Sequence, residues 1–174
     1  MKPLDSKLLK RFLKQASSSL KGRWLLIGGT LLPAVGLDVR ATIDIDLIGL
    51  GAKEKAQNLE LMNLVEALGL SIESINQAAE FFLQKAGYVE ADLIPLQTGK
   101  HCTIFRPSAA LYLKLKIGRL SESDLQDSIH YFQYCVKAGD DIDRAAISSM
   151  LARELAKQAS EERKRGLGIL AALA

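Results

Sequence analysis

Hydrophobic positions recur with a helical period in one part of the chain and with an extended period in another. Between Leu4 and Leu20 the apolar residues fall at helical spacing, and the opposite face is basic, which predicts an amphipathic first helix. Trp24 to Ile27 is a short apolar run, which predicts a strand. Residues 42–48 alternate between polar and apolar side chains and end at Gly49, which predicts a second strand with one polar face.

The later segments predict a mixed architecture. Residues 91–94 and 102–105 flank a Thr98-Gly99-Lys100 turn and predict either a hairpin or two sequential strands. Helical periodicity predicts helices over about 30–35, 53–68, 74–85, 108–117, 121–136 and 143–165. We therefore expect an α/β (α+β) fold, with a mixed sheet of about four to five strands flanked by helices and a helical C-terminal region. The whole chain, 1–174, is expected to form one domain, with a core over about 24–106 and a helical part over about 107–174.

Charge adds little to this expectation. The 174-residue chain carries a net charge of only +3, which gives no overall case for nucleic-acid binding. The first 23 residues are more basic than the rest, and a solvated helix face explains this better than an RNA-binding surface. Cys102 and Cys135 lie far apart without a metal-ligand spacing, so reduced, partly buried thiols are expected. With no apolar run long enough for a membrane span, we expect a cytoplasmic protein without membrane contact.

Candidate chemistry lies in the second strand. Residues i and i+2 of a strand project from the same face, so Asp44 and Asp46 are expected to lie side by side. Two such carboxylates suit Mg²⁺, or Mn²⁺, with coordination positions left for water and phosphate oxygens. The same tripeptide recurs at Asp141-Ile142-Asp143, where the following helical pattern predicts a helix cap instead.

A glycine pair precedes this strand. Gly28 and Gly29 end the first strand, where they permit a tight turn and close approach of backbone amides to a phosphate. Thr30 adds a hydroxyl donor. Only a short helix and a loop separate this turn from the aspartates, so both are expected to face one cleft.

Together these motifs resemble a known family. Ile27-Gly28-Gly29-Thr30 followed by Asp44-Ile45-Asp46 resembles the glycine-glycine-serine/threonine and Asp-x-Asp pattern of the polymerase β-like nucleotidyltransferase superfamily. Within it, Arg40, Thr42 and the Asp44-Ile45-Asp46 tripeptide are similar to the Arg-x-Thr-x-Asp-Ile-Asp form of minimal bacterial nucleotidyltransferases of the AbiEii-like type.

The resemblance implies further site residues. A third metal-binding and catalytic carboxylate is implied at Asp92, with Glu90 as the competitor. Lys114 or Arg40 would neutralise charge on the departing pyrophosphate, and Asp124 and Asp127 match the family less firmly.

The function implied is magnesium-dependent transfer of a nucleoside monophosphate from a nucleoside triphosphate to a hydroxyl of RNA, a protein or a small molecule. As in toxin-like members of the superfamily, a partner toxin or antitoxin is an open expectation. The alternative is a non-catalytic nucleotide-binding or regulatory module with the same fold.

Other polar and aromatic residues have simpler explanations. His101 and His130 have no metal-ligand spacing. Tyr131, Phe132 and Tyr134 are expected to belong to the core rather than to a base-stacking surface. The apolar tail, residues 167–174, is expected to pack on the domain or to contact a second subunit in a homodimer.

Overall fold

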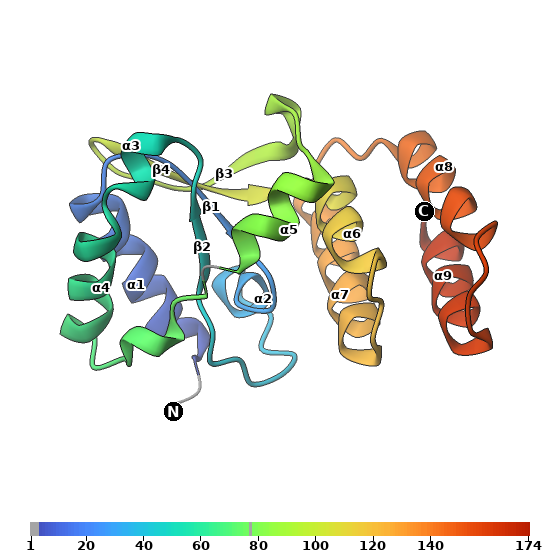
Figure 1. Cartoon of the computed structure of the whole chain (residues 1–174), viewed down its shortest axis with the longest axis horizontal. Coiled ribbons are helices and arrows are strands. Elements are labelled where there is room, and N and C mark those ends of the chain that lie inside the picture. The colour runs from blue at the N-terminus through green and yellow to red at the C-terminus, as the bar shows by residue number, and fades with distance from the viewer. Residues whose placement is uncertain (1–3, 77) are drawn as a thin grey trace.

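A mixed four-stranded sheet forms the centre of the N-terminal part of the molecule. The computed structural model describes residues 4–76 and 78–174. The strands are β1 (Gly22–Ile27), β2 (Asp46–Gly49), β3 (Leu93–Thr98) and β4 (Cys102–Pro107), in the order β2-β1-β4-β3. β1 runs parallel to β4, and the other two pairs are antiparallel. The predicted α+β class, with its mixed sheet and helical C-terminal region, is confirmed (Figure 1).

The two faces of the sheet bury different sets of side chains. Trp24 and Leu26 of β1 belong to the larger core, together with α1 (Ser6–Ser19) and α4 (Asn58–Ala67). Leu25 and Ile27 point to the other face and pack with α5 (Ala79–Ala86). This alternation follows from the two-residue period of a strand. Residues 24–27 of β1 are therefore buried on both faces, which accounts for their continuous apolar run.

Four helices complete the fold at the C-terminal side. They are α6 (Ala109–Ile117), α7 (Glu122–Ala138), α8 (Arg144–Leu155) and α9 (Glu161–Leu173). α6 packs on α7 and α8 packs on α9, and α8 and α9 lie farthest from the sheet (Figure 1). The predicted Ser121–Asp124 capping box opens α7, and Asp143 caps α8 as expected. Leu167 and Leu170 of the tail are buried, so the tail packs on its own domain.

Two predicted helices are interrupted. The predicted 53–68 helix divides into α3 (Ala52–Lys55) and α4. At the break between them, the Gln57 side chain forms hydrogen bonds with the backbone N–H and C=O of Lys21. The predicted 143–165 helix ends at Leu155 and restarts as α9, where Ser160 caps a new N-terminus.

Two predicted elements that border the site begin later than expected. β2 starts only at Asp46, since Ile45 pairs with Ile75 in an isolated parallel bridge. The same pairing keeps residues 75–76 extended, so the helix predicted from about residue 74 becomes η1 (Ile72–Ser74) followed by α5. This extended segment brings Asn76 to the start of β2.

The remaining core predictions agree with the structure. Cys102 and Cys135 are free and buried, and Tyr131 and Phe132 are buried in the larger core with Tyr134 packed against it. Among the described residues, no helix is both long enough and apolar enough to cross a membrane.

Candidate active site

The turn after β1 requires glycine because an acid and a base lie directly against it. Gly28 has a positive φ of 71°, and a Cβ there would lie 1.8 Å from Oδ2 of Asp46. A Cβ on Gly29 would lie 2.4 Å from Nη2 of Arg40. The glycine pair therefore lets the backbone touch the two charged side chains that the sequence predicted to act beside it.

Short α2 (Leu31–Ala34) follows the turn and carries the chain away from it. Thr30, which precedes α2, is fully buried, and its hydroxyl donates a hydrogen bond to the backbone oxygen of Asp44. The structure therefore places Thr30 as a support for the aspartate loop, beneath the surface that a phosphate would reach.

Asp46 is a buried carboxylate with few compensating contacts. Asp46 is the first residue of β2, and it lies beside the end of β1 because the strand register pairs it with Ile27. Only 8% of the residue is exposed, and its Oδ1 accepts a hydrogen bond of 2.6 Å from Nδ2 of Asn76. Burial raises the pKa of Asp46 to about 6, the Asn76 hydrogen bond opposes this rise, and the Asp44 charge adds to it.

Asp44 differs from Asp46 in its surroundings. It precedes β2 in an exposed loop rather than lying within the strand. Both carboxylates nevertheless line one cleft with Gly28, Gly29 and Arg40. The predicted convergence of the glycine turn and the aspartate pair is therefore observed.

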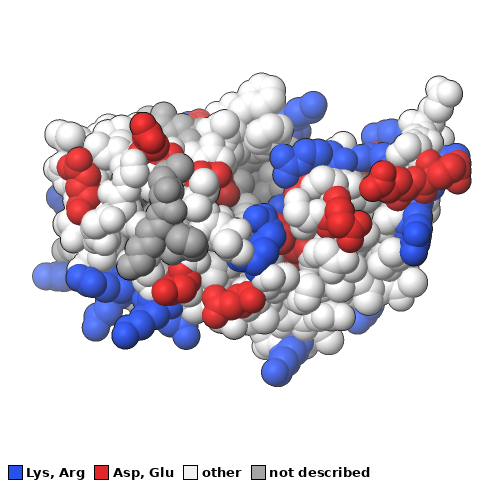
Figure 2. Space-filling view, turned by 90° about the horizontal axis from the view of Figure 1, so that it is seen from below, with Lys and Arg blue, Asp and Glu red and all other residues white. Residues whose placement is uncertain are grey.

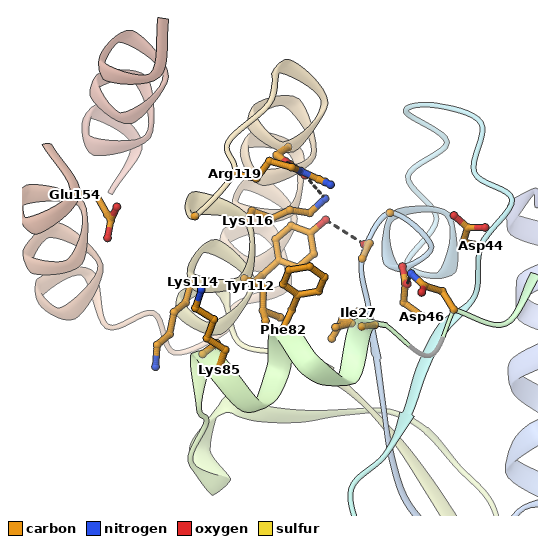
Figure 3. Close-up of a pocket in the computed structure, with 18 of the residues that line it drawn as sticks. Ile27, Asp44, Asp46, Phe82, Lys85, Tyr112, Lys114, Lys116, Arg119 and Glu154 are labelled. Atoms are coloured by element: carbon orange, nitrogen blue, oxygen red, sulfur yellow. Dashed lines mark hydrogen bonds and ion pairs between the residues drawn. The ribbon is translucent and has the colours of Figure 1, made fainter. Parts of the chain in front are cut away.

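The cleft lies between the sheet and the C-terminal helices and has a volume of about 1020 Å³. In Figure 3 Asp44 and Asp46 lie on one side, Lys116 and Arg119 project from the opposite side, and Glu154 of α8 lies farther out. Basic side chains border the hollow near the middle of the face shown in Figure 2. Tyr112 of α6 also lines the cleft, and its hydroxyl donates a 3.2 Å hydrogen bond to the backbone oxygen of Gly28.

A network of buried ion pairs forms the opposite wall. Nζ of Lys116 lies 2.9 Å from Oδ1 of Asp124 and 2.9 Å from Oδ2 of Asp127. Arg40 makes a two-bond contact of 3.0 and 2.9 Å with Asp127, and Arg119 makes one of 2.6 and 2.8 Å with Asp124. Arg40 thus connects the loop before β2 to α7.

This network determines the charge of its two acids. Burial alone would raise the pKa of Asp124, but hydrogen bonds from Arg119 and Lys116 hold that pKa well below its usual range. Burial likewise acts to raise the pKa of Asp127, and Arg40 and Lys116 lower it. Both acids are therefore charged and paired, and they act on the cleft by holding its cations in place.

Lys114 reaches the cleft from the exposed side of α6. Its Nζ donates a 3.2 Å hydrogen bond to the Gly87 oxygen at the end of α5, and the side chain lines the cleft. Three further residues line the cleft that the sequence did not predict as site residues, namely Asn76, Phe82 and Lys85. The sequence held one indication of the position of Phe82, since the i, i+3 spacing places it on the same face of its helix as Ala79.

Asp92, the predicted third carboxylate, does not join the aspartate pair. It belongs to η2 (Glu90–Asp92), where Oδ1 accepts a 2.7 Å hydrogen bond from Ser108 and Oδ2 accepts one of 3.0 Å from the Val89 amide. Neither Asp92 nor Glu90 lines the cleft, and Glu90 pairs with Arg23 instead. The reason is the strand order, because η2 leads into β3 at the opposite edge of the sheet from β2.

Metal-binding capacity therefore rests on the aspartate pair. Within residues 4–76 and 78–174, no group of three or more His, Cys, Asp or Glu side chains is arranged to hold a metal ion. Comparisons of this chain with protein-family models, with curated proteins and with solved structures find no match.

Proposed function

We propose that the protein is a magnesium-dependent nucleotidyltransferase that moves a nucleoside monophosphate from a nucleoside triphosphate to a hydroxyl acceptor. The observation that carries the proposal is the convergence of Asp44, Asp46 and the Gly28-Gly29 turn on one cleft. Acids and a tight glycine turn at one end, with Arg40 and Lys114 lining the same cleft, suit a metal-bound triphosphate.

The donor set of the aspartate pair fits Mg²⁺ bound together with a substrate. Mg²⁺ in phosphate-transfer sites is commonly held by one or two carboxylates, with phosphate oxygens and water completing the shell. Asp44 and Asp46 would hold the ion, which would neutralise the triphosphate and polarise its phosphorus centres. Asp46 favours such a cation because it forms no ion pair among the described residues, and the charges of Lys116 and Arg40 offset its burial only in part.

The transfer itself can be written with the residues of this cleft. The acceptor hydroxyl oxygen forms a bond to the α-phosphorus, and the bond from that phosphorus to its bridging oxygen breaks, which releases pyrophosphate. The hydroxyl proton passes to water, since Asp124 and Glu154, the other acids of the cleft, are already paired with basic side chains. Arg40 and Lys114 stabilise the negative charge that develops on the pyrophosphate.

A second candidate is a nucleotide-binding or regulatory module without transfer activity. The position of Asp92 favours it, because the carboxylate implied as the third member of the site lies outside the cleft. Such a module would bind nucleotide and Mg²⁺ through Asp44 and Asp46 without forming a product. The two candidates therefore differ in turnover and agree in binding.

One experiment separates them. Each labelled nucleoside triphosphate is incubated with Mg²⁺, the protein and RNA, protein or small-molecule acceptors, and transfer of label is measured. The variant Asp44→Asn/Asp46→Asn should lose transfer. The variant Asp141→Asn/Asp143→Asn should keep it, since this second Asp-Ile-Asp tripeptide lies outside the cleft and asparagine preserves the cap of α8.

Three results decide the proposal. Transfer that is lost only in the first variant supports the enzyme. Magnesium-dependent nucleotide binding without transfer to any acceptor supports the binding module. Transfer that is unchanged in Asp44→Asn/Asp46→Asn contradicts the assigned site.

A further inference from the structure

An exposed aromatic ring lies inside the cleft, on helix α5. Phe82 is 56% exposed and lines the cleft, whereas its neighbour Leu83 is buried in the second core cluster, with Leu25 and Ile27 of β1. Ala79, Phe82 and Ala86 fall at i, i+3 and i+7, so they share the helical face that lines the cleft. An isolated exposed phenylalanine is common on protein surfaces, so the surroundings of this ring decide its meaning.

Two lysines border this ring. Lys85 follows one helical turn after Phe82, and Lys114 approaches from α6 across the end of α5. Figure 3 shows Phe82, Lys85 and Lys114 grouped on the cleft wall below Tyr112. Both lysines line the cleft and are exposed, and neither forms an ion pair with a described acid. They differ in this from Lys116 and Arg119, whose charges are matched by Asp124 and Asp127.

We propose that Phe82, Lys85 and Lys114 form a nucleobase subsite, in which Phe82 stacks on a base and the two lysines bind the adjoining phosphates. This inference rests on the proposed function and extends it to the part of the substrate that the aspartate pair does not contact. An aromatic face beside unmatched cations is the combination that binds nucleotides without strict base preference.

A competing explanation is that Phe82 merely packs against Phe81. Their rings do touch edge to face, with centroids 5.7 Å apart at 77°. That contact uses only one ring edge and leaves Phe82 more than half exposed. Phe81 is even more exposed, at 64%, but does not line the cleft, and it therefore provides a matched control.

The base could belong to the nucleoside triphosphate or to the acceptor strand. The two sources share the same stacking chemistry, and direct binding measurements distinguish them. Three probes are used in calorimetry with Mg²⁺: ATP, inorganic tripolyphosphate, which has the phosphates without a base, and a short single-stranded oligoribonucleotide without nucleotide present.

The variants separate stacking from charge. Phe82→Leu keeps an apolar side chain without an aromatic face, Phe82→Trp keeps the face, and Phe81→Leu makes the same change outside the cleft. Stacking on Phe82 predicts that Phe82→Leu weakens the base-containing ligand roughly tenfold and that Phe82→Trp and Phe81→Leu do not. Tripolyphosphate should bind all three variants like the wild type. Lys85→Gln and Lys114→Gln should weaken tripolyphosphate and ATP alike.

The outcomes are distinct. A selective loss of ATP binding in Phe82→Leu assigns the subsite to the triphosphate, and a selective loss of oligoribonucleotide binding assigns it to the acceptor. If ATP, tripolyphosphate and the oligoribonucleotide bind Phe82→Leu as they bind the wild type, the stacking subsite is wrong while the phosphate and metal site stands. If none of the probes binds the wild-type protein, the proposed function fails and the subsite fails with it.

Discussion

Two buried acidic groups face each other across the cleft, and they are compensated in opposite ways. On the sheet side, burial raises the pKa of Asp46 to about 6. Among the described residues Asp46 accepts a hydrogen bond from the neutral amide of Asn76 and forms no ion pair, and the charges of Lys116 and Arg40 offset the rise only in part. On the helix side, Asp124 and Asp127 are at least as buried, yet their pKa values are lowered by Lys116 and two arginines. A buried aspartate thus lacks an ion-pair partner on the sheet side, whereas both buried aspartates of the helix side have basic partners.

This difference distinguishes a binding site from a structural one. Buried carboxylates that are already paired with cations leave nothing for a ligand to satisfy, and removing one partner of such a pair is costly. A buried carboxylate without a cation costs stability, and an external cation can recover that cost. The unequal compensation therefore supports placing the metal at Asp44 and Asp46 and assigning Asp124 and Asp127 to holding Arg40, Lys116 and Arg119.

Removing the central cation of the helix side should have the largest effect. Lys116→Met leaves two buried carboxylates close together, with Arg40 and Arg119 as their remaining ion-pair partners among the described residues, and we expect a loss of about 3 kcal/mol in the free energy of unfolding. Urea unfolding at pH 7 measures it. The control is Lys114→Met, two residues away on α6 and exposed, which should change stability by less than about 0.5 kcal/mol. Equal effects of the two substitutions would show that Lys116 compensates the buried acids of the helix side no more than an exposed lysine does.

Neutralising Asp46 should have the opposite sign. The folded-state pKa of about 6 lies above the usual aspartate pKa of 3.8, so the wild-type protein loses stability as pH rises from about 4 to about 6. Asp46→Asn removes the buried charge and can still accept the Asn76 hydrogen bond. Without metal, we expect it to be more stable than wild type by up to about 3 kcal/mol above pH 6, since each pKa unit corresponds to about 1.4 kcal/mol.

The pH dependence is the decisive part of that measurement. Below pH 4 Asp46 is protonated, so the two proteins should unfold with nearly equal free energies. Saturating Mg²⁺ should stabilise the wild type at pH 7 and leave Asp46→Asn unchanged. A variant that is less stable than wild type at pH 7 without metal would show that Asp46 is not an uncompensated charge.

Alanine substitutions at two separate glycines, Gly28 and Gly36, measure how closely the turn after β1 approaches Asp46. Gly28 and Gly36 both have positive φ, at 71° and 90°, but a Cβ on Gly36 would meet nothing within 4 Å. Both substitutions to alanine carry the conformational cost of about 1 kcal/mol, and only Gly28→Ala also displaces the Asp46 carboxylate. We expect Gly28→Ala to cost about 1 to 2 kcal/mol more than Gly36→Ala and to lose Mg²⁺ binding. Equal stabilities of the two variants would show that the carboxylate can move aside.

Much of the sheet side could be predicted from the sequence because its signals are local. The apolar run of β1, the glycine pair and the i, i+2 spacing of Asp44 and Asp46 all lie within a short stretch. Asn76 could not be predicted, because its place depends on the pairing of Ile45 with Ile75. The position of Asp92 depends on the strand order, which local periodicity does not determine.

The ion pairs of the helix side could not be predicted from the sequence, because they join residues that are far apart along the chain. Arg40 and Asp127 are 87 positions apart, and the sequence gives no reason to pair them. Lys116 falls on α6, a helix that is apolar on most sides, so its burial between two acids had no separate periodic signal. Phe82 was within a predicted helix, but its exposure in the cleft follows from the packing of α5 against the sheet and α6.

The smallest effect is expected at the exposed end of the helix-side network. The Arg119 side chain is 76% exposed although it makes two hydrogen bonds with buried Asp124, so water replaces much of what it supplies. We expect Arg119→Gln to cost less than about 1 kcal/mol in urea unfolding, well below Lys116→Met, because Lys116 and Ser121 still hold the Asp124 carboxylate. A loss as large as that of Lys116→Met would show that the compensation of Asp124 comes from the cleft surface rather than from the buried lysine. Arg119 would then belong to the functional wall, and phosphate ligands would compete with Asp124 for it.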